Sequence, residues 1–298
     1  MDDLIRRAMQ VFLNGLISGL AIALMALAFQ LVYLPTRVFF VGIAGLYTVA
    51  PYAYLAIHTS CGNVILSSIG SLLIVSLLAV LFEWINHGPL FQKGASDGAH
   101  LISSLGMYIV VVEGVAIIWG NSSQTLRTGV DFTVQALGVV LTKSQLLIAS
   151  VAVVALAAFV GMLQMTNLGL RLRALSANPT QFALYGYNVK RYRLFAFGLA
   201  GLLTAATSLV AAFDVDFNPH LGLPAMLLAV VAVISGGRSS FVGPVLGGLL
   251  IGVLRAEVVW YVSSRWQDAV TFAVLALFVV FRPQGLLGGR SGLELRAI

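Results

Sequence analysis

The sequence has 298 residues, of which 59% are hydrophobic and only 9% are charged. Soluble domains carry roughly 25% charged residues, so this composition excludes an ordinary soluble protein and places the chain in a bilayer. The net charge of +6 is spread over short loops, which is typical of positive-inside topology signals and argues against nucleic-acid binding. The single Cys61 excludes an internal disulfide.

Uncharged apolar stretches near the roughly 20 residues that cross the hydrocarbon core recur along the whole chain. We expect spans at residues 8–34, 38–57, 64–85, 98–119, 144–167, 192–213, 222–235, 243–261 and 268–282. All should be helices, because lipid satisfies no backbone hydrogen bonds and the alternating pattern of a barrel is absent. The fold class is therefore an all-α polytopic integral membrane protein with about eight to nine transmembrane or re-entrant helices. A single transmembrane domain should occupy residues 1–298.

The stretch 38–57 is the first irregular one. It follows Pro35-Thr36-Arg37 and carries Gly42 and Gly45 near its start. If every span crossed fully, counting back from the basic loop near residue 180 would put Arg6 and Arg7 outside, against the positive-inside rule. We therefore expect 38–57 to be re-entrant or broken, with the N-terminus on the cytoplasmic side.

The most basic loop lies at residues 170–193. Within it, a short helix should begin after Asn178-Pro179 and stop at Gly186, a plausible residue just beyond a helix end. This helix would lie exposed along the cytoplasmic surface and dock a partner, or the loop would be solvated and only set topology. The tail with Arg282, Arg290 and Arg296 is the next most basic segment and should share the cytoplasmic side.

A glycine-rich run from Ser235 to Gly248 joins the spans 222–235 and 243–261. Glycines let helices approach closely and let the backbone leave helical geometry beside a cavity. We expect this pair of spans to be a second broken segment, because paired interruptions point to a substrate path in transporters. Tight helix packing without any role in a path is the alternative.

Several segments occur in an order and spacing that resemble one family. They are the stretch 171–193, Asn218-Pro219-His220-Leu221-Gly222, the glycine run, and the ending Phe281-Arg282-Pro283-Gln284-Gly285-Leu286-Leu287-Gly288. With the opening Phe12-Leu13-Asn14-Gly15-Leu16, they resemble the permease subunits of branched-chain amino acid ABC importers. That hydrophobic amino acid uptake family also includes urea and amide permeases. The resemblance covers nearly the whole chain.

The resemblance implies a non-enzymatic, multi-pass subunit of the bacterial inner membrane that translocates branched-chain or other hydrophobic amino acids, or related small solutes. It would pair with a second permease subunit, expected to be a different chain, and dock two ATP-binding subunits. An extracytoplasmic binding protein would deliver the substrate. The chain itself would hold no cofactor and no metal, because ATP would be bound by the partners, and it would bind no nucleic acid.

The resemblance also assigns residues. Coupling to the ATPases is expected at residues 170–193, at Arg173, Asn178, Gln181, Ala183, Gly186, Asn188, Lys190 and Arg191. The translocation path is expected at Phe40, Gly42, Gly45, Tyr47, Glu113, Gly236, Gly237, Gly243, Gly247 and Gly248. Ile43 and Gly45 stand where many relatives carry His and Glu, so the path should be more apolar here.

Glu113 is the charged residue deepest within an expected span, where charge is expensive. It would bind a substrate ammonium or a proton, or it would be an ordinary inter-helix partner. A proton-coupled secondary carrier that uses Glu113 or Glu257 as its relay is the alternative function. Uptake that collapses with a protonophore while ATP is maintained would identify such a carrier.

Overall fold

The computed structural model describes residues 2–126, 133–136, 139–282 and 284–287. The basic positions Arg290 and Arg296, and Pro283 and Gly288 of the ending motif, lie outside these ranges. The helices are α1 (Asp2–Thr36), α2 (Gly42–Cys61), α3 (Val64–Phe82), α4 (Gly88–Gln92), α5 (Asp97–Trp119), α6 (Lys143–Met165), α7 (Asn167–Ala177), α8 (Pro179–Leu184), α9 (Val189–Asp214), α10 (Gly222–Gly236), α11 (Gly243–Tyr261) and α12 (Gln267–Phe281). A π-helix, Glu83–His87, joins α3 to α4, and 3-10 turns at Pro219–Leu221 and Ser264–Trp266 precede α10 and α12.

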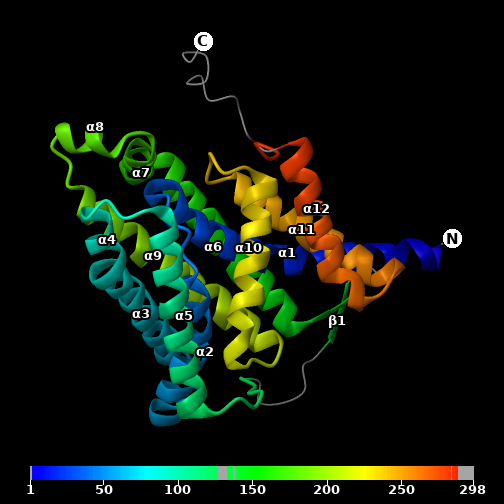
Figure 1. The fold of residues 1–298 in the computed structure, drawn as a ribbon. Helices are drawn as coiled ribbons and strands as arrows, with labels where there is room; N and C mark the ends of the chain where they lie inside the picture. The colour runs from blue at the N-terminus through cyan, green and yellow to red at the C-terminus, as the bar shows by residue number, and fades with distance from the viewer. Residues whose placement is uncertain (1, 127–132, 137–138, 283, 288–298) are drawn as a thin grey trace.

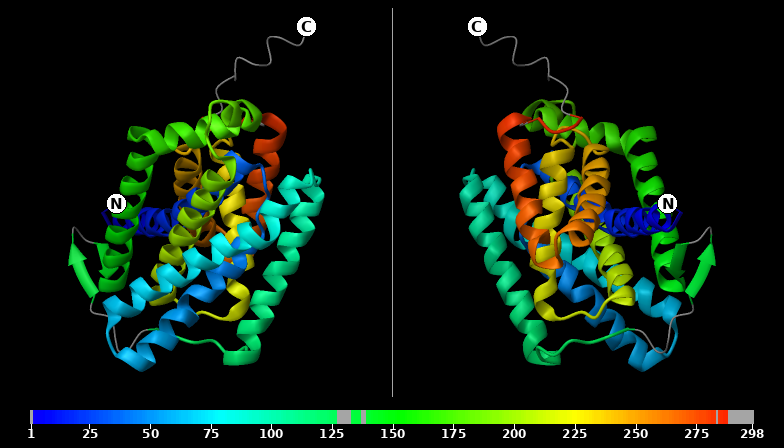
Figure 2. Two further views of the ribbon diagram at one scale, coloured as in Figure 1. Left: turned by 90° about the vertical axis from the view of Figure 1, so that its left-hand side faces the viewer. Right: turned by 90° about the vertical axis from the view of Figure 1, so that its right-hand side faces the viewer.

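The prediction of an all-α polytopic membrane protein is confirmed. Within the described residues, eight helical segments are long and apolar enough to cross a membrane. One small exception stands between α5 and α6, where β1 (Thr133–Ala136) and β2 (Val139–Thr142) form an antiparallel hairpin. The hairpin lies at the side of the helical bundle (Figure 2).

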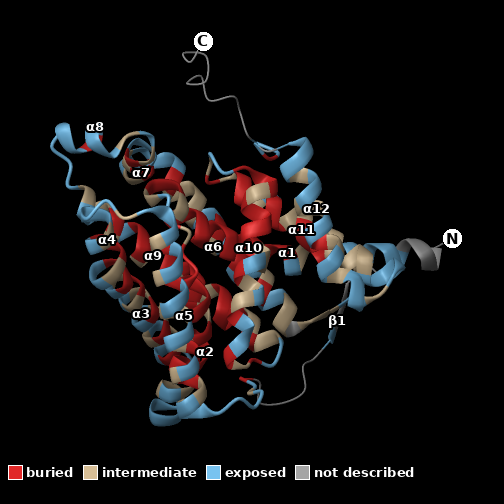
Figure 3. Cartoon of the chain, in the orientation of Figure 1, coloured by how far each residue is buried: buried red, intermediate tan, exposed pale blue. Residues whose placement is uncertain are grey.

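The helices α1, α2, α9 and α10 supply most of the buried core, whereas α3, α5 and α12 carry long exposed apolar faces (Figure 3). The exposed side chains include Leu77 at 67%, Ile117 at 84% and Val280 at 72%. In a protein of this composition such faces are expected to meet lipid, since lipid tails are as apolar as the side chains.

The ends of the bundle define two faces. The segment α7–α8 projects from one end (Figure 1), which we name the α8 face. The helix α9 starts at the α8 face and runs away from it, and α10 runs back antiparallel to α9. The turn 237–242, which follows α10, therefore also lies at the α8 face. The turn after Cys61, which joins α2 to α3, lies at the other end, which we name the Cys61 face.

The expectation that the N-terminus shares the side of the basic loop is wrong. Gly15 packs on Val253 of α11, whereas Gly19 packs on Leu249, so α1 runs antiparallel to α11 and begins toward the Cys61 face. Gln10 of α1 also exchanges hydrogen bonds of 2.6 and 2.9 Å with the backbone of Val140 in β2. The charge of Arg6 and Arg7 is outweighed by the basic residues at the α8 face, which include Arg37, Lys93, Arg171, Arg173, Lys190, Arg191, Arg238 and Arg282.

The segment 38–57 runs from the α8 face to the Cys61 face instead of returning, although α2 is not among the eight segments with the length and hydropathy of a full span. Residues 37–41 are non-helical and α2 begins only at Gly42, whose amide donates to the Ser104 hydroxyl of α5 at 2.8 Å. Gly45 then packs on Tyr108 and Val111 near the middle of α5. This segment is broken, as predicted, but the break precedes the glycines and the chain continues to the Cys61 face.

The second predicted break is a turn between two helices. The segments Pro219–Gly236 and Gly243–Tyr261 each have the length and hydropathy of a full span. Residues 237–242 therefore connect complete helices at the α8 face. The side-chain amide of Gln30, which is fully buried, holds this turn by donating to the carbonyls of Arg238 at 2.8 Å and Ser240 at 3.1 Å.

Candidate functional site

The segment α7–α8 is built as the sequence predicts. Asn178 is the N-cap of α8, where its side-chain oxygen accepts from the amides of Thr180 and Gln181, both at 3.0 Å. Gly186 follows the helix with a φ of 84°, a left-handed conformation that glycine adopts without strain. Asn188 then caps α9 by accepting from the amide of Arg191 at 3.2 Å. Caps therefore fix both ends of the connection between α8 and α9.

An aromatic cluster anchors α8 to the bundle. Phe182, which is 3% exposed, stacks on Tyr187 with ring centroids 4.9 Å apart and meets Tyr192 of α9 edge-on at 5.2 Å. Arg171 of α7 lies over the Tyr187 ring at 5.2 Å and donates to the Tyr192 hydroxyl at 2.8 Å. That hydrogen bond raises the pKa of Arg171, so the guanidinium stays charged. The segment is therefore a rigid projection.

The outer surface of this projection carries exposed apolar side chains. Leu184 is 83% exposed and Tyr185 is 82% exposed, although both are large. The predicted coupling residues surround them, and the exposed ones are Arg173, Gln181, Ala183, Gly186, Asn188, Lys190 and Arg191, with Asn178 half-buried. Sequence reasoning had not selected Leu184 or Tyr185. Their signal is an apolar pair at the end of a short helix in an otherwise basic loop.

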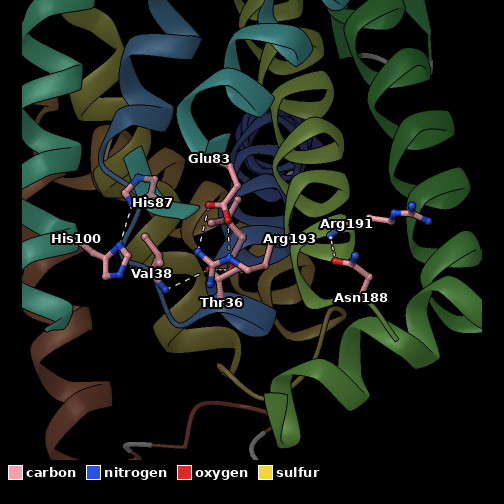
Figure 4. A network of polar contacts seen from close by, with 9 residues as sticks. Thr36, Val38, Glu83, His87, His100, Asn188, Arg191 and Arg193 are labelled. Atoms are coloured by element: carbon pink, nitrogen blue, oxygen red, sulfur yellow. Dashed lines mark hydrogen bonds and ion pairs between the residues drawn. The ribbon is translucent and has the colours of Figure 1, made fainter. Parts of the chain in front are cut away.

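A buried ion pair follows this segment along the chain, where α9 meets the π-helix (Figure 4). Arg193, in the first turn of α9, donates from Nε to one Glu83 oxygen at 2.5 Å and from Nη2 to the other at 3.2 Å. The two side chains are only 3% and 1% exposed. The Arg193 guanidinium also lies 4.4 Å from the ring centroid of Phe91 in α4. The pair thus ties the start of α9 to the π-helix after α3.

Two histidines extend this network toward α5. His87, the last residue of the π-helix, and His100 of α5 are buried, and their Nδ1 atoms are 3.1 Å apart (Figure 4). Phe40 from the non-helical segment 37–41 packs edge-on against His87 with centroids 5.4 Å apart. The network therefore joins α9, α3, α5 and the break before α2. No local sequence pattern indicates these contacts, since Glu83 and Arg193 are 110 residues apart.

The residues expected along the translocation path fall into two groups. Phe40, Gly42 and Gly45 are buried where the break meets α5. Tyr47 is half-buried and lines a cavity of about 550 Å³ between α1, α2, α9, α10 and α11.

The glycine run lies in helix packing. A Cβ on Gly236 or Gly243 would overlap the backbone of the other helix of the α10–α11 pair, and one on Gly247 would overlap the carbonyl of Ala232 in α10. Gly248 packs in the same way on Ala23 of α1. Gly237, with a φ of 120°, ends α10. The geometry favours the packing alternative for these residues.

The carboxylates within spans lie in different environments. Glu113 is exposed on α5, so it does not point into the bundle of this chain. Glu257 is half-buried on α11. Arg255, its neighbour in sequence, pairs instead with Asp268 at 2.8 Å. Glu83 is the inter-helix partner described above.

Comparison with known proteins identifies the family of this chain. Residues 11–279 match the family model described as branched-chain amino acid transport system / permease component. The chain is 26% identical to the high-affinity branched-chain amino acid transport system permease protein LivH of Salmonella typhimurium, over 94% of this chain and 95% of that protein. It is 27% identical to the corresponding permease protein BraD of Pseudomonas aeruginosa, with the same shares covered.

A solved structure, PsaBC from Streptococcus pneumoniae in complex with Fab, shares the fold with a TM-score of 0.50 and 14% identity over 90% of each chain. The family match spans nearly all of the helical bundle, and this is a family of transport permeases and not of enzymes. The protein is a multi-pass membrane protein of the branched-chain amino acid transport permease family.

Proposed function

We propose that this chain is the transmembrane permease subunit of an ABC importer. It translocates branched-chain or other hydrophobic amino acids, or related small solutes, across the bacterial inner membrane, driven by ATP hydrolysis on partner subunits. The whole of residues 1–298 acts as one permease domain, with 170–193 as its cytoplasmic coupling loop. The observation that carries the proposal is the capped, aromatic-anchored α8, which presents Leu184 and Tyr185 beside basic side chains.

An exposed apolar pair on a rigid projection is suited to docking, because rigid aromatic and aliphatic anchors lose little conformational freedom on binding. The basic neighbours Arg173, Lys190 and Arg191 would steer an acidic rim of the partner. Two ATP-binding subunits would dock in this way, one on this chain and one on a second permease. Both ATP and any metal it carries would bind to those partners and not to this chain.

The buried network gives the docked segment a route into the bundle. When the ATPases close, a push on α8 passes through Phe182 to Tyr192 and to the first turn of α9, where Arg193 holds Glu83. Movement of the π-helix then reaches α5 through His87 and His100. The break at 37–41 packs on the same cluster through Phe40, so α2 would move with it. Rocking of these helices would give alternating access.

The orientation of the chain also suggests where the binding protein, the lipid and the second permease would contact it. With the α8 face in the cytoplasm, the cavity lined by Tyr47 and the loop after α9 would face the extracytoplasmic binding protein. Lipid would cover the exposed apolar faces, and a second permease, a different chain, would pair with this one. The glycine run would keep α10 and α11 close to α1 as one moving unit.

Affinity purification of the tagged chain from its native membrane, followed by mass spectrometry, tests the proposal. ATP-binding subunits should be recovered with the wild type and lost with Ala183→Glu or Tyr185→Ala, because Ala183 of α8 and Tyr185 just after it are both exposed and neither supports the core. Ser60→Glu, at an exposed position on the Cys61 face, is the matched control and should retain the subunits.

Recovery of the chain alone, together with uptake that a protonophore abolishes while ATP is maintained, would instead establish the proton-coupled carrier. In that case Glu257 and Glu113 would be the first positions to replace.

A further inference from the structure

The cavity that Tyr47 lines has a volume of about 550 Å³, and positive, negative and apolar side chains line different parts of its wall. It reaches the loop that joins α9 to α10, so it lies toward the Cys61 face. Its volume falls within the roughly 300–1,000 Å³ typical of small-molecule sites. A second cavity of about 350 Å³ shares Asn14, Ile22 and Arg255 with it, so the two adjoin along α1 and α11.

Arg255 supplies positive charge to this wall. Its side chain is only 15% exposed, although it lies within a membrane-spanning helix. Its hydrogen bonds to Asp268 and Thr271 both use Nη1, at 2.8 and 3.2 Å. A guanidinium carries five N–H donors in a fork that matches a carboxylate, so donors remain for a ligand. A charged side chain held this deep in a span is a candidate for binding a ligand.

Acceptors lie on the rest of the wall. Asp214 and Asp216 line the cavity where α9 ends, and the carboxyl end of a helix carries partial negative charge. The side-chain oxygen of Asn14 is buried and accepts no hydrogen bond from any described residue. Because buried acceptors are normally paired, this oxygen is suited to a donor brought by a ligand.

Aliphatic side chains, among them Ile22 and Leu228, form the remaining wall. We propose that this cavity binds a small zwitterionic amino acid, with its carboxylate at Arg255, its ammonium at Asn14 and the carboxylates that end α9, and its aliphatic side chain against the apolar wall. This inference rests on the proposed function, since it names the site where the permease accepts its substrate.

Direct binding of leucine to the complex isolated with the full-length chain, in nanodiscs, tests the site. Two analogues dissect it: 3-methylbutylamine lacks the carboxylate and 4-methylpentanoate lacks the ammonium. Each should bind at least tenfold more weakly than leucine. Arg255→Gln should lower leucine affinity at least tenfold and leave the amine unchanged, because only the carboxylate uses the guanidinium. Arg255→Lys should lie between, since it keeps the charge but loses the fork.

Asp268→Asn is the matched control, because it removes the same ion pair while leaving the guanidinium in the cavity. Leucine affinity within twofold of wild type is the expected result. Equal losses in Asp268→Asn and Arg255→Gln, unchanged affinity in Arg255→Gln, or no leucine binding by the wild type would each overturn the site. Failure of the proposed function is a separate result, since it would appear as absence of ATP-binding subunits from the isolated complex.

Discussion

Arg193 and Glu83 show how far a single pair of side chains can connect separate helices. The carboxylate and guanidinium meet in a two-point contact and are almost fully buried. Burial of charge is costly and is compensated only while both partners remain. The pair lies about one turn into α9, so under the proposed function it would respond early to a movement of α8.

Replacing Glu83 alone should therefore be severe. Glu83→Gln leaves the Arg193 charge buried without its counter-charge and should cost about 3–5 kcal/mol of stability. The double variant Glu83→Leu with Arg193→Met removes both charges and should recover much of that loss. Unfolding in detergent, followed by circular dichroism, measures both. A double variant as unstable as the single one would show that packing and not charge governs this position.

Gln30 is a second residue whose effect is local and measurable. Gln30→Leu removes the donor that serves the carbonyls of Arg238 and Ser240, and a lost buried hydrogen bond costs roughly 1–3 kcal/mol. Gln10→Leu is the matched control, because Gln10 also bonds a backbone carbonyl but at an exposed site. The same unfolding assay should give a clearly smaller loss for Gln10→Leu, and similar losses would argue against a special role for the turn.

Among the described helices, α1 and α11 share the most extensive contact, and it explains much of the glycine pattern. Gly15 and Gly19 of α1 face Gly248 and Gly252 of α11 so closely that a Cβ on Gly252 would overlap the Gly19 backbone. Gly248 and Gly252 stand at small-xxx-small spacing in the sequence, which is typical of a smooth helix face. This spacing did not indicate the partner, because it describes one surface only.

Gly252→Ala should consequently separate the two helices and reduce thermal stability strongly. Gly106→Ala is the control, since a Cβ there has nothing within 4 Å, and it should be neutral or stabilising by up to about 1 kcal/mol through helix propensity. Thermal stability of both variants in the same detergent measures the contrast. Equal behaviour would mean that α1 and α11 can move apart freely.

The limits of sequence reasoning follow from particular elements. The signals for α8 were local, namely Asn178-Pro179 at its start and Gly186 at its end, and the helix has those bounds within a residue or two. The spans were predicted because hydropathy is also local. By contrast, the histidine pair, the Glu83–Arg193 pair and the cavity depend on residues far apart in the chain. No local pattern specifies which helices become neighbours.

At the scale of the whole molecule, the structure shows which segments lie at each end of the bundle. The antiparallel packing of α1 and α11 puts the start of the chain and Cys61 on one side and α8 on the other. The crossing count from sequence failed because it depended on one ambiguous segment. The non-helical residues 37–41 and α2 together run from the α8 face to the Cys61 face, and hydropathy alone does not show whether such a segment crosses or returns.

Site-directed labelling tests this arrangement. Cys61 is exposed and the chain has no other cysteine, so an impermeant maleimide should label the wild type from outside the cell. In a Cys61→Ser background, Gln181→Cys should be labelled only from the cytoplasmic side and Arg7→Cys only from outside. Labelling of positions 7 and 181 from the same side would contradict the orientation of α1.

The contact between the segment after α12 and the turn 237–242 has a consequence for biosynthesis. The amides of Leu286 and Leu287 donate to the carbonyls of Ser235 and Gly236 at 2.9 and 3.1 Å, and Gly285 packs on Gly237. These donors are translated only after α10, α11 and α12. The hydrogen bonds at the carboxyl end of α10 can therefore form only after α11 and α12 have been synthesised. This region completes its folding late.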